Sequence, residues 1–182
     1  MSDLLAIRPI GPVDDLLLAD LARHLTDQWG FACHIVKARS NPAHAFNEQR
    51  KQYDAKLILK SLMAERPRHI HRLIGVTGAD LYVPILKFVY GLAEINGHCA
   101  LISLHRLNPE FYDQPPNPGV LQRRCEKTAL HELGHMLGLT HCRDRRCIMY
   151  SSTKIEDTDF KDAALCPSCS DLLAWHRSTT PV

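Results

Sequence analysis

The sequence predicts an α/β fold of mixed α+β character, in which helices cover a mixed sheet. Three observations support this prediction. Extended apolar segments alternate with amphipathic helical segments in the first half of the chain, a hairpin signal follows at Asn96-Gly97, and a long helical segment comes next. Alternating β-α-β units require right-handed crossovers and mostly parallel strands. The hairpin adds an antiparallel strand, which we expect at an edge of the sheet.

The first three elements are predicted from the spacing of apolar residues. Residues 4–10 are mostly apolar and indicate a strand. Residues 13–29 repeat apolar side chains at helical intervals, and residues 31–36 indicate a short second strand. The apolar side of this first helix is expected to carry four leucines, namely Leu16, Leu17, Leu21 and Leu25.

A loop, a second helix and a third strand follow. Residues 37–47 are largely polar and predict a loop. Residues 49–65 predict a helix, and residues 73–77 predict a strand that Gly78 ends. The apolar side of this second helix is expected to carry Tyr53, Leu57, Ile58 and Leu62.

The hairpin and a further helix complete the main elements. Residues 88–95 and 100–104 flank Asn96-Gly97, a dipeptide typical of tight hairpin turns. Residues 108–118 are punctuated by prolines and predict a surface loop. Helical spacing returns over residues 121–137.

Length and composition indicate one globular domain. The chain has 182 residues, of which 45% are hydrophobic, and its formal net charge is +2. Such a small charge argues against nucleic acid or an anionic membrane as the main partner. No apolar run reaches the ~18 residues that span a bilayer, and the first residues lack the apolar core of a secretory signal. We therefore expect a cytoplasmic, monomeric protein without a nucleic-acid or membrane partner.

Histidine and glutamate residues form the first of two metal-binding patterns. His131, Glu132, His135, Gly138 and His141 give H-E-x-x-H-x-x-G-x-x-H. On a helix the first two histidines share one face, and a glycine turn can bring the third one back. Three imidazoles leave one position of a zinc ion open for catalysis, and the neighbouring carboxylate can act as base on a metal-activated water. Chance would give the whole pattern with a probability on the order of 10⁻⁴.

Cysteines form the second pattern. Four of them have the spacings C-x4-C and C-x2-C, which bring four thiolates to one tetrahedral ion; these are Cys142, Cys147, Cys166 and Cys169. Disulfides are disfavoured because no secretory signal is present, and free thiols are disfavoured by the clustering. A nucleic-acid-binding zinc ribbon is disfavoured because basic and acidic residues balance over residues 142–182. We expect structural zinc at these cysteines, a last helix near residues 171–177, and three core cysteines elsewhere, Cys33, Cys99 and Cys125.

The combined pattern is similar to that of a known peptidase family. The histidine pattern is the signature of the metzincin clan of zinc peptidases, and Met149 stands where that clan has its Met-turn. The cysteine directly after the third histidine, the cysteine two residues before Met149 and the distal C-x-x-C resemble the archaemetzincin (archaelysin) family. Residues 80–84 and 88–91 also look like stretches of that family, so the resemblance covers nearly the whole chain.

The resemblance implies a metzincin-like zincin fold with a twisted mixed sheet, an active-site helix and a small C-terminal subdomain. One compact catalytic domain would comprise an N-terminal part, residues 1–141, and a C-terminal part with the Met-turn, residues 142–182. Two zinc ions per chain are implied, one catalytic and one structural. The catalytic ion would be held by His131, His135 and His141, and the structural ion by Cys142, Cys147, Cys166 and Cys169. Glu132 would be the general base, and no role is transferred to Tyr150.

Two functions remain in view. The first is a zinc-dependent metalloprotease that hydrolyses peptides or unfolded protein segments, with a strand near residues 88–91 pairing with the extended substrate. The second is a catalytically weak or inactive protein of the same fold that acts by binding a metal or a partner. The intact Glu132 favours the enzyme, because a pure binding protein has no need of that carboxylate.

Overall fold

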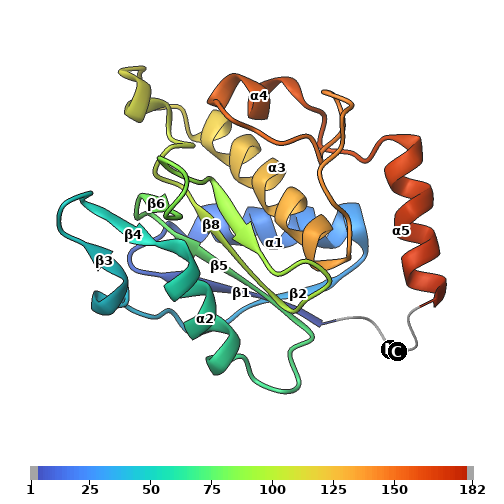
Figure 1. The fold of residues 1–182 in the computed structure, drawn as a ribbon, viewed down its shortest axis with the longest axis horizontal. Helices are drawn as coiled ribbons and strands as arrows, with labels where there is room; N and C mark the ends of the chain where they lie inside the picture. The colour runs from blue at the N-terminus through green and yellow to red at the C-terminus, as the bar shows by residue number, and fades with distance from the viewer. Residues whose placement is uncertain (1–3, 180–182) are drawn as a thin grey trace.

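A five-stranded mixed sheet forms the centre of the molecule. The structure, a computed structural model, describes residues 4–179 (Figure 1). The strand order is β2-β1-β5-β8-β7. The bounds are β1 Leu4–Ile10, β2 Ala32–Ile35, β5 Arg72–Thr77, β7 Gly91–Ala93 and β8 Cys99–Ser103. Four strands are parallel, and β7 lies antiparallel to β8 at one edge. The predicted mixed sheet with an antiparallel edge strand is confirmed.

Helices cover both faces of this sheet. Helices α1 (Asp15–Trp29) and α3 (Pro118–Met136) lie on one face, and α2 (Ala55–Glu65) lies on the other (Figure 1). The alternation of side chains along the strands explains the two layers. In β1, Leu5 and Ile7 belong to the core shared with α1 and α3, whereas Ala6 belongs to the core under α2. A strand buried on both faces reads as a continuous apolar segment, which is why β1 is visible in the sequence.

The second helix is shorter than predicted. It begins at Ala55 rather than near residue 49, because the Asp54 side chain accepts a hydrogen bond from the backbone N–H of Lys56 and caps the helix there. The preceding residues form a small second sheet, with β3 (Phe46–Asn47) and β4 (Gln52–Asp54) paired and β6 (Leu81–Tyr82) beside β4. The expected loop over residues 37–47 therefore contains β3 and a 3-10 helix, η1 (Ala43–Ala45).

The apolar sides of α1 and α2 are rotated from those predicted. Leu16 is 77% exposed and Leu57 is 40% exposed, whereas Leu18 and Leu59 are buried in their place. Consecutive apolar residues in both helices leave the orientation undetermined until the sheet selects a face. Of the three cysteines expected in the core, Cys99 and Cys125 are buried and Cys33 is partly exposed.

The remaining helices also differ in length from the predictions. Helix α3 begins at Pro118, three residues before its predicted start, because Asn117 caps it and proline fits its first turn. The expected loop before it includes the 3-10 helix η2 (Pro109–Tyr112). The C-terminal helix α5 spans Pro167–Thr179, and the short helix α4 (Ile155–Phe160) was not predicted. None of the helices formed by residues 4–179 has both the length and the apolar character that a bilayer crossing requires.

Candidate active site

The C-terminal turns of α3 carry three of the predicted site residues. His131 and Glu132 are 8% and 5% exposed, and His135 follows one turn later. The helix ends at Met136, and the chain then turns at Gly138, whose φ is +91°. Such a positive φ suits glycine because a Cβ atom disfavours it. This turn returns the chain so that His141 faces the other two histidines.

The three histidines are brought together, and two of them direct their Nε2 atoms toward each other. Their candidate ligand atoms all lie within 4.8 Å of one another, and Nε2 of His131 is 3.2 Å from Nε2 of His135. Nδ1 of His131 lies 2.8 Å from the Ile148 carbonyl oxygen, and Nδ1 of His135 lies 2.8 Å from the Leu139 carbonyl oxygen. A neutral imidazole that donates from Nδ1 presents the lone pair of Nε2 to a metal. This donor set fits a zinc ion with an open position.

Electrostatics keep these imidazoles neutral. Burial lowers the pKa of His131, His135 and His141, and the positive charge of Lys161 lowers each of them further. Neutral imidazole is the form that binds a metal. The surroundings of the three rings therefore favour metal binding over protonation.

Glu132 lies beside the three histidines and outside their ligand group. Burial raises the pKa of this carboxyl group to about 8, and the charge of Lys161 opposes part of that rise. The side chain packs against the backbone of Gly91 in the edge strand β7. A Cβ atom at position 91 would lie only 2.5 Å from Oε1 of Glu132, so the carboxylate occupies its place because residue 91 has no side chain.

This close approach gives a first prediction. Gly91→Ala should force the Glu132 carboxylate to move and lower kcat of the expected peptidase activity by about tenfold or more, since small displacements of the group expected to act as base are costly. Zinc content, measured by mass spectrometry, should not change because the histidines are untouched. Gly78→Ala is the matched control, because its Cβ would meet no atom closer than 3.7 Å. Equal kcat values for the two variants would contradict this account of Gly91.

Met149 lies beneath the histidines. It is completely buried, and its sulfur packs against Gly134 of α3, where a Cβ atom would clash with it. The backbone N–H of Cys142 donates to the Met149 carbonyl oxygen at 2.9 Å, and the carbonyl of the preceding Ile148 faces His131. The predicted Met-turn residue therefore lies in a turn that supports the site from below.

The four cysteines of the second pattern also converge. Their sulfur atoms all lie within 4.8 Å of one another, and all four are free thiols in the structure. Backbone N–H groups of Asp144 and Cys166 point to the sulfurs of Cys142 and Cys147, each at 3.4 Å. N–H groups directed at sulfur stabilise a thiolate, the form that binds zinc. The cluster is adjacent to the histidines in the chain, since Cys142 follows His141 directly.

A cleft of about 510 Å³ contains the histidines and Glu132. One wall is the segment that leads into β7, one is α3, and the third comes from the residues around α4. The lining is mostly apolar on the β7 side, with Phe88, Tyr90 and Leu92 among its residues. Leu86 and Ile95 also line the cleft and are exposed. The cleft thus combines an apolar wall with a few polar groups that converge on one place, as ligand-binding clefts commonly do.

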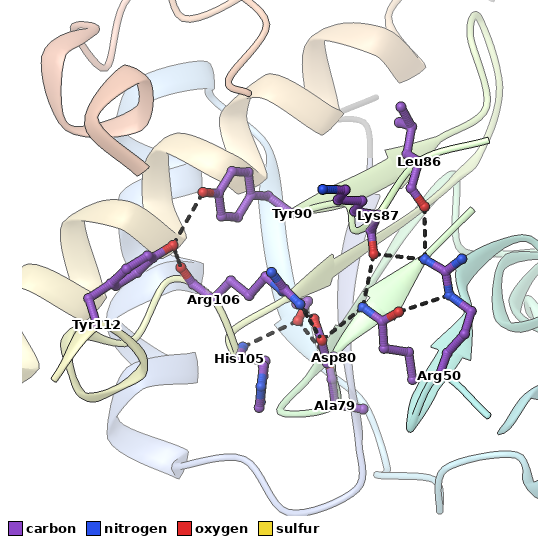
Figure 2. A network of polar contacts seen from close by, with 11 residues as sticks. Arg50, Ala79, Asp80, Leu86, Lys87, Tyr90, His105, Arg106 and Tyr112 are labelled. Carbon is purple, nitrogen blue, oxygen red and sulfur yellow. Dashed lines mark hydrogen bonds and ion pairs between the residues drawn. The ribbon is translucent and has the colours of Figure 1, made fainter. Parts of the chain in front are cut away.

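A polar network supports the β7 wall (Figure 2). The guanidinium of Arg106 binds the Asp80 carboxylate through two hydrogen bonds of 2.7 and 2.8 Å and lies 4.3 Å from the ring centre of Phe88. Tyr112 donates to the Arg106 carbonyl oxygen at 2.8 Å, and its hydroxyl is 3.4 Å from that of Tyr90. Two cleft residues, Phe88 and Tyr90, thus rest on one network.

The same network fixes the loop before β7 from its other side (Figure 2). Arg50 donates to the carbonyl oxygens of Leu86 and Lys87 at 3.0 and 2.9 Å. Gln52 donates to Asp80 at 2.9 Å and to Lys87 at 3.1 Å. The small second sheet, which carries Gln52, is therefore tied to the wall of the cleft.

Asp80 is the centre of this network and gives a second prediction. Burial alone would raise its pKa, but hydrogen bonds from Arg106 and Gln52 outweigh burial and hold the pKa below the ordinary 3.8. Asp80→Asn should lower the free energy of unfolding by about 2–3 kcal/mol at pH 7, somewhat less than the loss of a fully buried ion pair. This difference in free energy of unfolding should shrink as the pH falls from 3.8, the ordinary pKa, through the lower pKa of Asp80 in the folded protein. Below that pKa Asp80 is protonated in the parent, so it no longer forms the ion pair.

Urea unfolding at neutral and acidic pH measures this effect, and KM should rise as the cleft wall loosens. The control is Asp20→Asn, which removes an exposed pair with Arg23 on α1 and should change stability by less than about 1 kcal/mol. An Asp80 variant as stable as the control at pH 7 would rule out this role for the network.

Several residues of the cleft were not found from the sequence. Gly91 lies in the stretch 88–91, which was expected to pair with substrate, but its contact with Glu132 was not predicted. Asp80, which supports the cleft wall, falls in a stretch that drew attention only by resemblance. Lys161 and Thr158 line the cleft and are 3% and 1% exposed, yet no spacing rule distinguishes them in the sequence. The cue that could have found Lys161 is its position in the cysteine-punctuated segment after Met149.

Comparisons with known proteins agree with this geometry. The sequence profile described as peptidase family M54 matches residues 32–174. The chain is 44% identical over 165 residues to an archaemetzincin of Methanocaldococcus jannaschii, which covers 91% of this chain and 89% of the relative. It is 38% identical to an archaemetzincin of Pyrococcus furiosus, with 93% and 91% covered.

Solved structures show the same fold. The archaemetzincin of Methanopyrus kandleri superposes with a TM-score of 0.83 at 31% identity and covers 96% of both chains. The archaemetzincin of Archaeoglobus fulgidus, solved as a complex with malonate, gives a TM-score of 0.81 at 30% identity, covering 92% of this chain and 98% of that one. The predicted fold class is therefore confirmed.

Proposed function

This chain belongs to peptidase family M54, the archaemetzincins, and is thus a zinc metallopeptidase; on that premise we propose how its residues hydrolyse a peptide bond. The observation that carries the proposal is the convergence of three imidazoles and one buried carboxylate in a single cleft. We assign the catalytic zinc to His131, His135 and His141. A zinc ion held there would polarise a carbonyl group and make water acidic enough to react near neutral pH.

Glu132 is proposed as the general base. Its carboxylate sits beside the histidine nitrogens without belonging to the ligand group, so it is free to accept a proton from the attacking water and deliver it to the leaving nitrogen. Packing against Gly91 holds the carboxylate in one position, and the residue is only 5% exposed. The protein therefore positions the proposed base, Glu132, relative to the three histidines before substrate binds.

The edge strand β7 is proposed to bind the substrate backbone. It pairs with β8 on one side only, which leaves the hydrogen-bonding groups of its other side available to an added strand. The backbone N–H of Asn96, in the turn after β7, donates to the His135 carbonyl oxygen at 2.9 Å. This bond fixes the hairpin relative to α3, so a peptide aligned on β7 would lie across the histidines.

The apolar lining indicates the class of substrate. We propose that the cleft takes extended peptides or unfolded protein segments with apolar side chains near the cleaved bond, because Phe88, Tyr90 and Leu92 line its β7 side. Exposed Leu86 and Ile95 extend this apolar surface.

The cysteine cluster is proposed to hold a second, structural zinc ion, which would give two ions per chain. Four thiolates form a closed tetrahedral site with no open position for substrate. Cys142 adjoins His141, and Cys147 adjoins Ile148, whose carbonyl faces His131. An ion at the cysteines would therefore fix two backbone positions on which the histidine site depends.

A cleavage screen tests the proposed activity. Zinc-loaded protein is incubated with a mixture of unfolded protein fragments, and new termini are identified by mass spectrometry. Cleavage next to apolar residues, absent after zinc removal, is the expected result. A loaded protein that cleaves nothing would favour the alternative of a catalytically inactive binding protein.

A further inference from the structure

Lys161 is a buried cation in the wall of the catalytic cleft. It directly follows α4 and is 3% exposed. Its Nζ donates a hydrogen bond to the Tyr150 carbonyl oxygen at 3.1 Å, next to Met149 in the chain. The same side chain lines the cleft together with Glu132 and the three histidines. The second lysine of the lining, Lys87, is exposed at the rim.

The charge of Lys161 acts on every group of the site. Burial has the largest effect on the pKa of Glu132 and of each histidine, and the positive charge of Lys161 adds a lowering effect on all four. The ammonium group therefore lies within electrostatic range of the base and the metal-binding nitrogens at once. A charge in water at the surface would be screened and would not have this reach.

This cation makes no salt bridge among the described residues, although the charges of Glu132 and Asp157 attract it from a greater distance. None of the ion pairs found among residues 4–179 includes Lys161, and its hydrogen bond to Tyr150 uses one of its three N–H donors. Burial lowers the pKa of Lys161 to about 8. Burying a charge without a salt-bridge partner costs free energy, and such groups are concentrated at functional sites.

We propose that Lys161 is a catalytic residue that donates a hydrogen bond from Nζ to the carbonyl oxygen of the cleaved peptide bond. This inference rests on the proposed peptidase function. As the water oxygen bonds to the carbonyl carbon, negative charge develops on the carbonyl oxygen, and the ammonium stabilises it. The C–N bond then breaks, Glu132 passes the proton from water to the leaving nitrogen, and Lys161 keeps its own proton throughout.

Three variants separate this role from a structural one. Lys161→Met keeps the length of the side chain and removes its charge, and Lys161→Arg keeps the charge. Lys127→Met is the matched control, because Lys127 also donates from Nζ to backbone carbonyls of the α4 region, those of Thr158 and Asp159. Lys127 does not line the cleft. If both lysines had a purely structural role, the two Met substitutions should have similar effects on melting temperature and on zinc content.

Two readouts are measured on zinc-loaded protein. The first is kcat and KM for cleavage of a fluorescent unfolded casein. The second is the equilibrium dissociation constant of a phosphinic peptide with two leucine-like side chains, in which a phosphinate anion replaces the scissile amide. The second readout needs no turnover, so it tests Lys161 even if the parent protein hydrolyses nothing. Absence of hydrolysis by the parent would contradict the proposed function, whereas unchanged phosphinate affinity in Lys161→Met would contradict the role of Lys161.

The expected result is a kcat lower by about 10²–10³-fold in Lys161→Met with KM changed less than about threefold. The Lys161→Met variant should also bind the phosphinic peptide at least about tenfold more weakly than the parent. Lys161→Arg should recover part of both losses, and Lys127→Met should show neither loss. A Lys161→Met variant with parental kcat and phosphinate affinity would overturn the proposal. So would losses that appear only with reduced zinc content and disappear when zinc is added, since Lys161 would then support the metal site only.

Discussion

Replacing Glu132 by glutamine is expected to reduce kcat/KM for peptide hydrolysis by about 10³-fold or more, near the upper end of what a general base contributes. Glutamine has nearly the shape of glutamate, so the packing against Gly91 is retained. It cannot accept the proton of the attacking water at neutral pH. Zinc content should remain at the parental value, because Glu132 is outside the histidine ligand group.

The control for this variant lies on the same helix. Glu126 is a partly buried carboxylate of α3 that faces His24 at 3.5 Å and does not line the cleft. Glu126→Gln should leave kcat/KM within about twofold of the parent, and steady-state kinetics on both variants separates loss of a base from a general disturbance of α3. A Glu132 variant as active as the Glu126 variant would refute the proposed mechanism.

Cys166→Ser is expected to have the largest effect on stability. It removes one of four ligands from the proposed structural zinc, whose binding is part of the folding free energy. We expect the free energy of unfolding to fall by at least about 3 kcal/mol, which lowers the melting temperature by roughly 10 °C. Activity should fall as well, because Cys142 and Cys147 adjoin the segments that position His141 and the Ile148 carbonyl.

Calorimetry and metal analysis measure these changes together. Cys33→Ser is the matched control, since Cys33 is also only partly buried and lies outside the cluster. It should retain the parental zinc content and melt within a few degrees of the parent. If Cys166→Ser behaved in the same way, the cysteines would not hold a structural ion.

Sequence reasoning was most successful where chemistry and local structure coincide. His131, Glu132 and His135 are four or fewer residues apart on one helix, so the helical period alone brings them together. Gly138 then predicts the turn that returns His141, and its positive φ confirms that turn. The mostly parallel sheet was predictable for a similar reason, because β1 and β5 are buried on both faces and read as continuous apolar segments between helical ones.

The predictions were wrong where distant contacts decide the structure. The residues before Ala55 have helical apolar spacing, yet they form β4 because β6, far along the chain, pairs with it. Leu16 and Leu18 are equally apolar, and only packing against the sheet selects Leu18 for burial. A single sequence shows the repeat of apolar residues along a helix or strand, but it does not show which side of that element another element will cover.

The same limit applies within the cleft. Asp80 and Arg106 form an ion pair although they are 26 residues apart in the sequence. Lys161 lines the cleft, but the residues around it show no spacing that would predict this position. These groups act through contacts that form only in the folded protein, so no sequence motif identifies them. The candidate metal ligands were predictable because metal chemistry restricts the types and spacing of such residues, whereas the residues that support them are not restricted in this way.

The most direct test of the account is a zinc titration followed by metal analysis and hydrolysis of fluorescent casein in parallel. Mild chelation should first remove the ion from the three neutral imidazoles and leave one zinc per chain at the four thiolates, since the latter bind zinc more tightly. The account predicts that this one-zinc protein is folded and inactive, and that activity returns in proportion to the second zinc and saturates at two per chain. Full activity with one zinc, or no activity with two, would contradict it.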